Sequence, residues 1–597
     1  MRFDGLIALP KQLGTSVRKW QSLSQHTTQH TTGLGRAQTH NLMTSSADCD
    51  VVAEITGNFG KWQLRTIIFI FLCKIPATWF TACISFTAPV PLTKEYFCIP
   101  PVTNGANSSM PRSLYGAKEA LEKTDREFYI DQCYYTPPED QHGLNNSDNN
   151  SKQLSYEKRI PCDEFEHRAE YSSLVMQFDL VCSREMLVAL TQAFHALGGL
   201  VGGLIALNIM DFVSPKRLML IGMFGQIVCG NLTGLVPTFI LHVFYRCVTS
   251  VFCAFMVVSG KVIVSDITFG RQRMITNTLS DLFASIGLIL LPGVTLYCDS
   301  WNSLYIAISS SLLLFIIPHR WITDSPRWLL KQGHINETLQ ILVQSARINN
   351  KEIPLDVATR LEQQSWDLQQ GKKHLYWTIW DGKTPRRFIA LLHWLWAVSV
   401  VIYTVMILMI RLLGVKHMHV NTFCLGLAEM LGIAMGLYII LYTRRHWLCS
   451  GWLMIIAGVT TYFIWLSPNN VKESRKAGYE LLFWLILKML NSAVLVVLTA
   501  CSGQMVAPEK RPMLMLSTGC FSGFWLTVVP FTLVIGKIHY LLPMTMFATA
   551  AVSSGIIMCY FNTYFQKNVN AKPSRTMLIP PQSLVNHKPT SLIEECN

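Results

Sequence analysis

Charged residues are scarce in this chain, and the motifs of common enzyme classes are missing. Only 15% of its 597 residues are Asp, Glu, Lys or Arg, and 50% are apolar, whereas soluble domains carry about 25% charged residues. The sequence contains no G-x-x-x-x-G-K-[ST] nucleotide loop, no H-E-x-x-H and no G-x-S-x-G. These absences argue against an enzyme and against an ATP-driven pump, and we expect no metal and no cofactor.

The start of the chain lacks the short apolar core of a secretory signal. Residues 1–60 are rich in His, Thr, Gln and Ser, which predicts a polar cytoplasmic arm. The net charge of +13 does not indicate nucleic-acid binding, because the basic residues lie between apolar runs and form no patch with interleaved aromatics. They fit the excess of Lys and Arg in cytoplasmic loops of membrane proteins better.

Long apolar runs dominate the rest of the sequence, and a run of about 20 such residues can cross a bilayer as a helix. Twelve candidates are found, which predicts an all-α membrane protein with twelve transmembrane helices in two six-helix bundles. They cover approximately residues 65–90, 186–209, 217–236, 239–262, 276–297, 303–319, 388–411, 419–442, 447–466, 479–501, 513–535 and 541–562.

A long polar segment, residues 91–185, separates the first two runs and should lie outside the cell. It holds three N-x-S glycosylation acceptors, Asn107, Asn145 and Asn149. Four cysteines lie in the same segment, which predicts two disulfides in one of three possible pairings. These cysteines are Cys98, Cys133, Cys162 and Cys182.

A second polar segment, residues 320–387, divides the chain into two halves and should be cytoplasmic. The first bundle then spans 61–319, the second spans 388–562, and 563–597 form a cytoplasmic tail. Asp324 or Ser325 can cap a helix that has Pro326 in its first position. Leu339 and Leu342 could give the helices of this segment an apolar side. A surface connector and a regulatory element both remain open.

Charged and histidine side chains are distributed unevenly among the predicted spans. The third, sixth, ninth and twelfth spans have none in their interiors, which fits helices that face lipid, and the eleventh span is also uncharged. A lone ionisable group at mid-bilayer costs about 2.5–3.5 kcal/mol, so the others need partners or a water-filled cavity. This pattern favours a two-bundle transporter over a receptor. The residues concerned are Lys74, His195, Arg246, Lys261, Asp281, His393, Glu429 and Lys488.

Depth along the spans predicts two ion pairs. Lys261 and Asp281 should both lie in the inner third of the bilayer, and Glu429 and Lys488 should both lie near the middle. Lys74 has no evident partner, so it is the first candidate to meet a carboxylate or phosphate of a solute. Each of these charges could instead only fix helix packing.

Polar and aromatic groups on the same spans complete the expected cavity. Gln192, Trp396 and Tyr403 lie on charge-bearing spans, and aromatic faces suit flat or cationic solutes. His195 and His393 are expected to be hydrogen-bonded packing residues rather than proton relays.

Four stretches resemble a known family. T-D-S-P-R-W-L (323–329) is similar to the P-E-S-P-R-W-L motif of the organic cation, anion and carnitine transporters, solute carrier family 22 of the major facilitator superfamily. F-D-L-V-C (178–182), G-N-F-G-K-W-Q (57–63) and S-D-I-T-F-G-R-Q-R (265–273) resemble further motifs of that family, as does Arg246. The resemblance covers residues 50–562 and implies alternating-access transport at the plasma membrane, with both termini cytoplasmic.

The family's cytoplasmic gating motifs are altered. Its G-x-x-x-D-R-x-G-R-R loop reads L-N-I-M-D-F-V-S-P-K-R here (207–217), so Asp211 is kept but both glycines are lost. The resemblance implies a gate of nine charged residues, and the alterations indicate a divergent member. The gate residues are Asp211, Lys216, Arg217, Asp266, Arg271, Asp324, Arg327, Arg444 and Arg445.

The solute's charge is left open. Gly523 stands where cation-transporting relatives have Asp and anion-transporting relatives have Arg, while Lys261 and Asp281 replace a Tyr and a Gln. A small organic ion, a zwitterion or a vitamin-like metabolite is expected, with the bilayer as a further partner and a coupling ion as an open possibility. The alternative is a membrane scaffold or receptor that has kept the fold and lost transport.

Overall fold

The computed structural model describes most of the apolar spans and the segment between the two halves. The described residues are 50–57, 59–89, 96–98, 133–135, 160–162, 165–167, 171–370, 380, 385–412, 417–463, 473–506, 510–535, 539 and 542–571. The predicted glycosylation sites Asn107, Asn145 and Asn149 lie outside this part of the chain, as does almost all of the N-terminal arm.

The first bundle contains six membrane-spanning positions. Pro215 and Pro326 occupy first-turn positions, where a missing N–H leaves no bond unmade, and Ser214 and Ser325 cap those helices. The helices are α3 (Lys61–Ala82) continued by α4 (Ile84–Thr87), α8 (Met186–Ile209), α9 (Pro215–Leu235), α10 (Phe239–Ile267), α11 (Gly270–Thr295) and α12 (Trp301–Ser310), which ends in the 3₁₀ turns η4 (Ser311–Phe315) and η5 (Ile317–Trp321).

The second bundle repeats this arrangement after the linker. Its helices are α16 (Arg386–Leu408) with the short η7 (Met409–Leu412), α17 (Met418–Tyr442), α18 (His446–Tyr462), α19 (Glu473–Cys501) with η10 (Ser502–Met505), α20 (Arg511–Val534) and α21 (Leu542–Ala571).

Each of the twelve predicted spans coincides with a helix. Within the described residues, ten helices are long and apolar enough to cross a membrane. The other two positions are α12, whose apolar stretch Trp301–Phe315 is short, and α18, with 17 residues. The sixth span is interrupted because α12 tightens into 3₁₀ turns from Ser311 onward, so the expected single helix over 303–319 is wrong in its second half.

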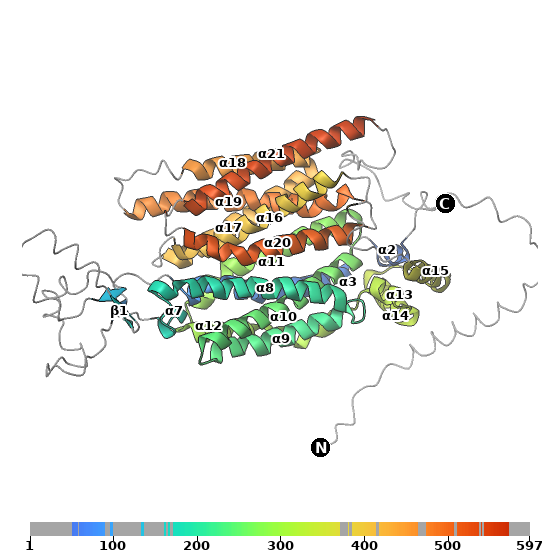
Figure 1. Cartoon of the computed structure of the whole chain (residues 1–597). Coiled ribbons are helices and arrows are strands. Elements are labelled where there is room, and N and C mark those ends of the chain that lie inside the picture. The colour runs from blue at the N-terminus through green and yellow to red at the C-terminus, as the bar shows by residue number, and fades with distance from the viewer. Residues whose placement is uncertain are drawn as a thin grey trace, which may run out of the picture. The chain divides into compact units, whose positions relative to one another are not determined.

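The bundles meet along two helix pairs. α11 packs against α17, and α8 packs against α20, whereas α9 packs on α12 and α18 packs on α21 within their own bundles (Figure 1). Gly426 of α17 permits one crossing, because a Cβ there would lie 2.7 Å from Cγ1 of Ile289 on α11. The helices predicted to be free of charge, other than α20, are therefore those away from the interface.

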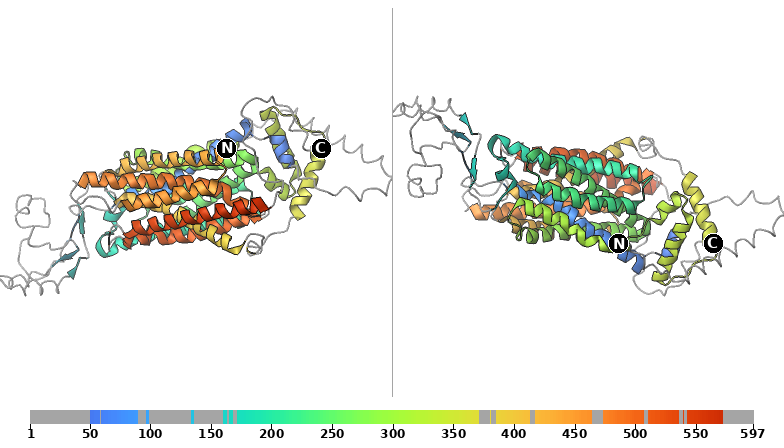
Figure 2. Two further views of the ribbon diagram at one scale, coloured as in Figure 1. Left: turned by 90° about the horizontal axis from the view of Figure 1, so that it is seen from above. Right: turned by 90° about the horizontal axis from the view of Figure 1, so that it is seen from below.

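The segment between the halves forms three helices, α13 (Pro326–Lys331), α14 (Ile335–Asn349) and α15 (Val357–Gln370). They pack with α2 (Val51–Thr56) around one apolar cluster that includes Val52, Leu330, Leu342 and Leu361 (Figure 2). The predicted cap is confirmed at Ser325, whose Oγ accepts from the Trp328 N–H at 3.1 Å. Near its end, the N-terminal arm thus contains a helix that packs on the linker.

The loop between α4 and α8 contains short antiparallel pairs. β1 (Tyr96–Cys98) pairs with β4 (Phe165–His167), and β2 (Tyr134–Tyr135) pairs with β3 (Ile160–Pro161). After these strands come α7 (Leu174–Gln177) and η3 (Cys182–Glu185). Cys133 and Cys182 form a disulfide, and Cys162 is also disulfide-bonded, while the side chain of Cys98 lies outside the described residues. Trp301 Nε1 donates to Gln177 Oε1 at 2.8 Å, which fixes the end of the loop on α12.

Candidate functional site

Lys74 of α3 forms an ion pair with Asp281 of α11, so the prediction that it has no partner is wrong. Its Nζ lies 2.6 Å from Asp281 Oδ1, and it also donates to Ser280 O at 3.2 Å and Ser280 Oγ at 3.3 Å. An ammonium group has three N–H donors, so these contacts occupy all of them. The predicted Lys261–Asp281 pair is corrected accordingly, because α3 brings a nearer cation to Asp281.

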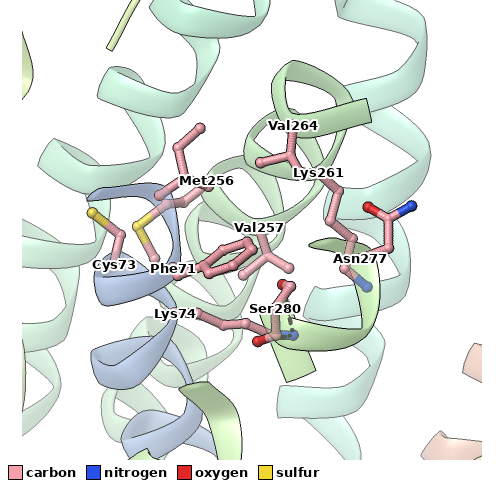
Figure 3. Close-up of a pocket in the computed structure, with 10 residues that line it drawn as sticks. Phe71, Cys73, Lys74, Met256, Val257, Lys261, Val264, Asn277 and Ser280 are labelled. Atoms are coloured by element: carbon pink, nitrogen blue, oxygen red, sulfur yellow. Dashed lines mark hydrogen bonds between the residues drawn. The ribbon is translucent and has the colours of Figure 1, made fainter. Parts of the chain in front are cut away.

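Lys261 of α10 lies near the Lys74–Asp281 pair but is not part of it. Among the described residues it makes no hydrogen bond and no ion pair, although Lys74 and Asp281 are within electrostatic range. Its side chain faces a pocket that it lines together with Lys74, Asn277 and Ser280, and Figure 3 shows Lys261 beside Asn277. Phe71, Met256 and Val257 form part of the apolar wall. Of the two lysines that line this pocket, Lys261 is therefore the one whose N–H donors are not occupied by described residues.

Glu429 of α17 and Lys488 of α19 form the second ion pair, as predicted. Lys488 Nζ lies 2.9 Å from Glu429 Oε2, and the side chains are 0% and 2% exposed. Tyr403 of α16 donates to Glu429 Oε1 at 2.9 Å, and Lys488 Nζ lies 3.3 Å from the centroid of its ring. This cluster lies wholly within the second bundle.

Arg246 lies in the first third of α10 and is fully buried within the first bundle. Its guanidinium donates to Gln192 Oε1 at 2.8 Å and to the hydroxyl of Tyr305, and it lies 5.9 Å from the ring centroid of Phe80. No ion pair with a carboxylate is found for it among the described residues. Gln192 is therefore occupied by a protein partner.

The two histidines and Trp396 are also held by protein groups. His195 Nε2 lies 3.3 Å from Thr81 Oγ1, and His393 bonds Ile389 O at 2.7 Å and Ser517 Oγ at 2.9 Å. Trp396 Nε1 donates to Ser502 Oγ at 3.0 Å. These contacts are typical of packing residues, which is the role expected for both histidines.

Three predicted gate carboxylates take part in contacts between the linker and the first bundle. Asp211 and Asp266 lie on the first-bundle side, and Asp324 lies in the linker. Asp211, after α8, forms an ion pair with Lys331 at 3.1 Å, and Gln332 Nε2 donates to Asp211 O at 2.7 Å. Asp266 Oδ2 accepts from Ser325 Oγ at 2.5 Å. Asp324 Oδ1 accepts from the Lys216 backbone N–H at 3.4 Å. These contacts join the linker to the first bundle.

The predicted gate arginines have different surroundings. Arg327 lies 4.9 Å from the ring centroid of Phe269, and the Arg217 backbone N–H donates to Ser214 Oγ at 3.3 Å. Arg444 and Arg445 are exposed in the turn between α17 and α18. Arg271 is exposed at the start of α11. Among the described residues, neither Arg444 nor Arg445 forms an ion pair with the first bundle.

Sequence reasoning missed two polar residues of the pocket, Asn277 and Ser280 of α11. Both are small uncharged side chains, which carry no charge signal in an apolar run. Asn277 lies three residues before Ser280 and four residues before Asp281, a spacing that places the three along one side of the helix, and that periodicity could have indicated them. In the described part of the chain, no group of three or more His, Cys, Asp or Glu side chains is placed to hold a metal ion.

The bundles touch at the end that carries the 91–185 loop. Ser85 Oγ of α4 donates to Ile407 O of α16 at 3.2 Å, and the rings of Phe86 and His419 have centroids 5.2 Å apart. The two halves are therefore in direct contact at this end. A rocking motion of one bundle against the other would have to break these contacts.

Comparison with known proteins agrees with this architecture. The family model of the Major Facilitator Superfamily matches residues 176–472. Solute carrier family 22 member 3 of Rattus norvegicus is 27% identical over 437 residues, covering 70% of this chain and 75% of the relative. The beta-alanine transporter of Drosophila melanogaster is 22% identical over 534 residues, covering 85% of each chain.

Solved structures share the fold. The proton:xylose symporter XylE bound to 6-bromo-6-deoxy-D-glucose has a TM-score of 0.53 at 13% identity, and the match covers 84% of this chain and 96% of the symporter. The chain is thus similar in sequence to transporters of solute carrier family 22 and has the fold of the major facilitator superfamily, and these findings support a multi-pass membrane protein that transports small organic solutes.

Proposed function

We propose that the protein moves its solute across the plasma membrane by alternating access, with the solute bound at the first bundle near Lys74, Asp281 and Lys261. The single observation that carries this proposal is Lys261, a cation that faces a pocket without a bonded partner among the described residues. An ionisable side chain inside a membrane helix is costly and usually marks a solute or ion path. A scaffold would gain nothing from such a residue.

The two ion pairs support a path between the bundles. Asp281 belongs to α11, which packs on α17, and Glu429 belongs to α17 itself. Gln192, His195, Trp396 and Tyr403 then surround the path as supporting residues rather than as first contacts of the solute.

A cytoplasmic gate is the second part of the proposal. Asp211, Asp266 and Asp324 hold the linker against the first bundle, and Arg444 and Arg445 are exposed on the second bundle. Closure at this end would bring the arginines toward these carboxylates. Such charge-assisted contacts can bias a two-state equilibrium by a few kcal/mol.

Orientation and location follow from the same reasoning. Both termini and residues 320–387 would be cytoplasmic, and residues 91–185, with glycans on Asn107, Asn145 and Asn149, would be extracellular. The disulfides fit that side, because they persist in oxidising surroundings. A coupling ion is compatible with this arrangement.

The relatives suggest where to look for the solute. Their names include a beta-alanine transporter and an organic cation transporter protein, so amino and carboxylate compounds are sensible first candidates. The test is an untargeted comparison of metabolites in cells with and without the protein at the surface. Depletion of at least one organic solute from the medium is expected, and unchanged profiles despite surface expression would contradict the proposed transport route.

A further inference from the structure

The charges on the solute path do not cancel. Lys74 and Asp281 form one pair, and Glu429 and Lys488 form the other, which leaves Lys261. Three lysines and two carboxylates give 3 − 2 = +1 for this set of described residues. The path therefore carries an excess positive charge inside the membrane.

Among the described residues, the carboxylates of these two pairs already have partners other than Lys261. Asp281 binds Lys74 at 2.6 Å, and Glu429 is engaged by Lys488 and by the Tyr403 hydroxyl, with 2% exposure. Lys74 is also fully occupied, since Asp281 and Ser280 take all of its donors. Of the two cations that line the pocket among the described residues, only Lys261 has N–H donors that no protein group occupies.

The pocket encloses about 20 Å³, which admits a small head group such as a carboxylate rather than a whole solute, and its walls suit a head group that is attached to an apolar body. Asn277 and Ser280 supply polar groups near Lys261, while Phe71, Met256 and Val257 supply apolar surface (Figure 3). Binding sites for organic molecules combine an apolar wall with a few placed polar groups in this way. A small inorganic anion would leave the apolar wall unused.

We propose that the solute carries a carboxylate and that Lys261 binds it, so the protein transports organic anions or carboxylate-bearing zwitterions rather than simple organic cations. This inference rests on the proposed function, because the pocket matters for transport only if it lies on the solute path. The side chain of Lys261 is exposed toward the pocket, so a carboxylate can reach it and form a charge-assisted hydrogen bond. Repulsion from the same charge would exclude a cationic group from this position.

Binding to the purified full-length protein in lipid nanodiscs tests the proposal without requiring transport. The probes are carboxylates of graded size, each matched by the amine of the same carbon skeleton, with sodium chloride as the inorganic control. We expect some carboxylates to raise the thermal unfolding temperature while their matched amines do not. Lys261→Gln should weaken the binding of those carboxylates at least tenfold, and Lys261→Arg should keep most of it.

Controls separate folding and charge effects from recognition. Lys351→Gln removes the same charge from an exposed position in the linker and should leave binding unchanged. The unfolding temperature without probe reports whether Lys261→Gln is folded, and if that variant does not fold, Lys261→Arg and Lys261→Met take its place. The proposal would be overturned if the amines, or chloride alone, raised the unfolding temperature. It would also be overturned if no carboxylate raised it, or if carboxylates raised it equally in wild type and Lys261→Gln. Failure of the cell-uptake test with intact carboxylate binding would contradict transport but not this site.

Discussion

Lys488 Nζ lies 2.9 Å from Glu429 Oε2 in a position where the two side chains are almost completely buried. Removing one member of such a pair leaves an uncompensated buried charge, which costs about 3–5 kcal/mol, whereas replacing both by apolar or neutral groups is often tolerated. The pair therefore predicts a strong dependence of each residue on the other.

We expect Glu429→Gln and Lys488→Met each to lower the free energy of unfolding by about 3–5 kcal/mol, and the double variant to recover most of that loss. The measurement is a double-mutant cycle on denaturation in detergent micelles. The Asp211–Lys331 pair provides a matched control, because its side chains are 40% and 50% exposed and such pairs contribute less than about 1 kcal/mol. Additive losses in the Glu429–Lys488 cycle would show that the two charges act independently.

At the first ion pair, we expect Asp281→Asn to reduce surface expression more than Lys74→Gln does. Asp281→Asn leaves the charges of Lys74 and Lys261 without a neighbouring carboxylate. Lys74→Gln leaves Asp281 with a second cation, Lys261, close to it. Combining Asp281→Asn with Lys74→Gln should restore expression in part, as measured by surface biotinylation. Restoration by Lys261→Gln and none by Lys74→Gln would favour the Lys261–Asp281 pairing instead.

For the cytoplasmic gate, Asp211→Asn should lower the maximal rate of uptake and leave the apparent affinity for the solute nearly unchanged. The Asp211–Lys331 pair is exposed and outside the pocket, so its loss should shift conformational populations rather than alter binding. Initial uptake rates over a range of solute concentrations distinguish these effects. A change in apparent affinity alone would remove Asp211 from the gate.

The start of the first membrane helix should depend on Asn349 at the end of α14. Asn349 Oδ1 accepts from the Trp62 N–H at 3.1 Å, and its Nδ2 donates to Thr56 O at 3.2 Å and Gln63 Oε1 at 2.9 Å. Because helix N-terminal N–H groups need such partners, Asn349→Ala should cost about 0.5–2 kcal/mol. Thermal unfolding measures this loss, and Asn350→Gly, at a backbone φ of 54°, is a neighbouring control that should not destabilise. An unchanged midpoint for Asn349→Ala would show that water replaces its contacts.

Sequence patterns located the spans because a bilayer requires long apolar runs, and they located Glu429 and Lys488 at the same depth. They failed for Asp281, because counting along a helix gives depth but not which neighbouring helix its side chain faces. An apolar stretch that is hydrophobic on all sides carries no clear periodicity, so the approach of α3 to α11 could not be read from it. Ser325 was predictable because helix caps depend on local sequence, whereas the contact of Asn349 with Trp62 joins residues 287 positions apart.

The contacts of the linker helices fix them to the first bundle, so they should move together with it. α13 is fastened to Met210, where Trp328 Nε1 donates to the backbone oxygen at 2.6 Å, and α14 is fastened to the start of α3 through Asn349. A fluorophore on the exposed face of α14 would therefore travel with the first bundle as a rigid marker. Its distance to a second fluorophore on α18 would then report the swing of one bundle past the other.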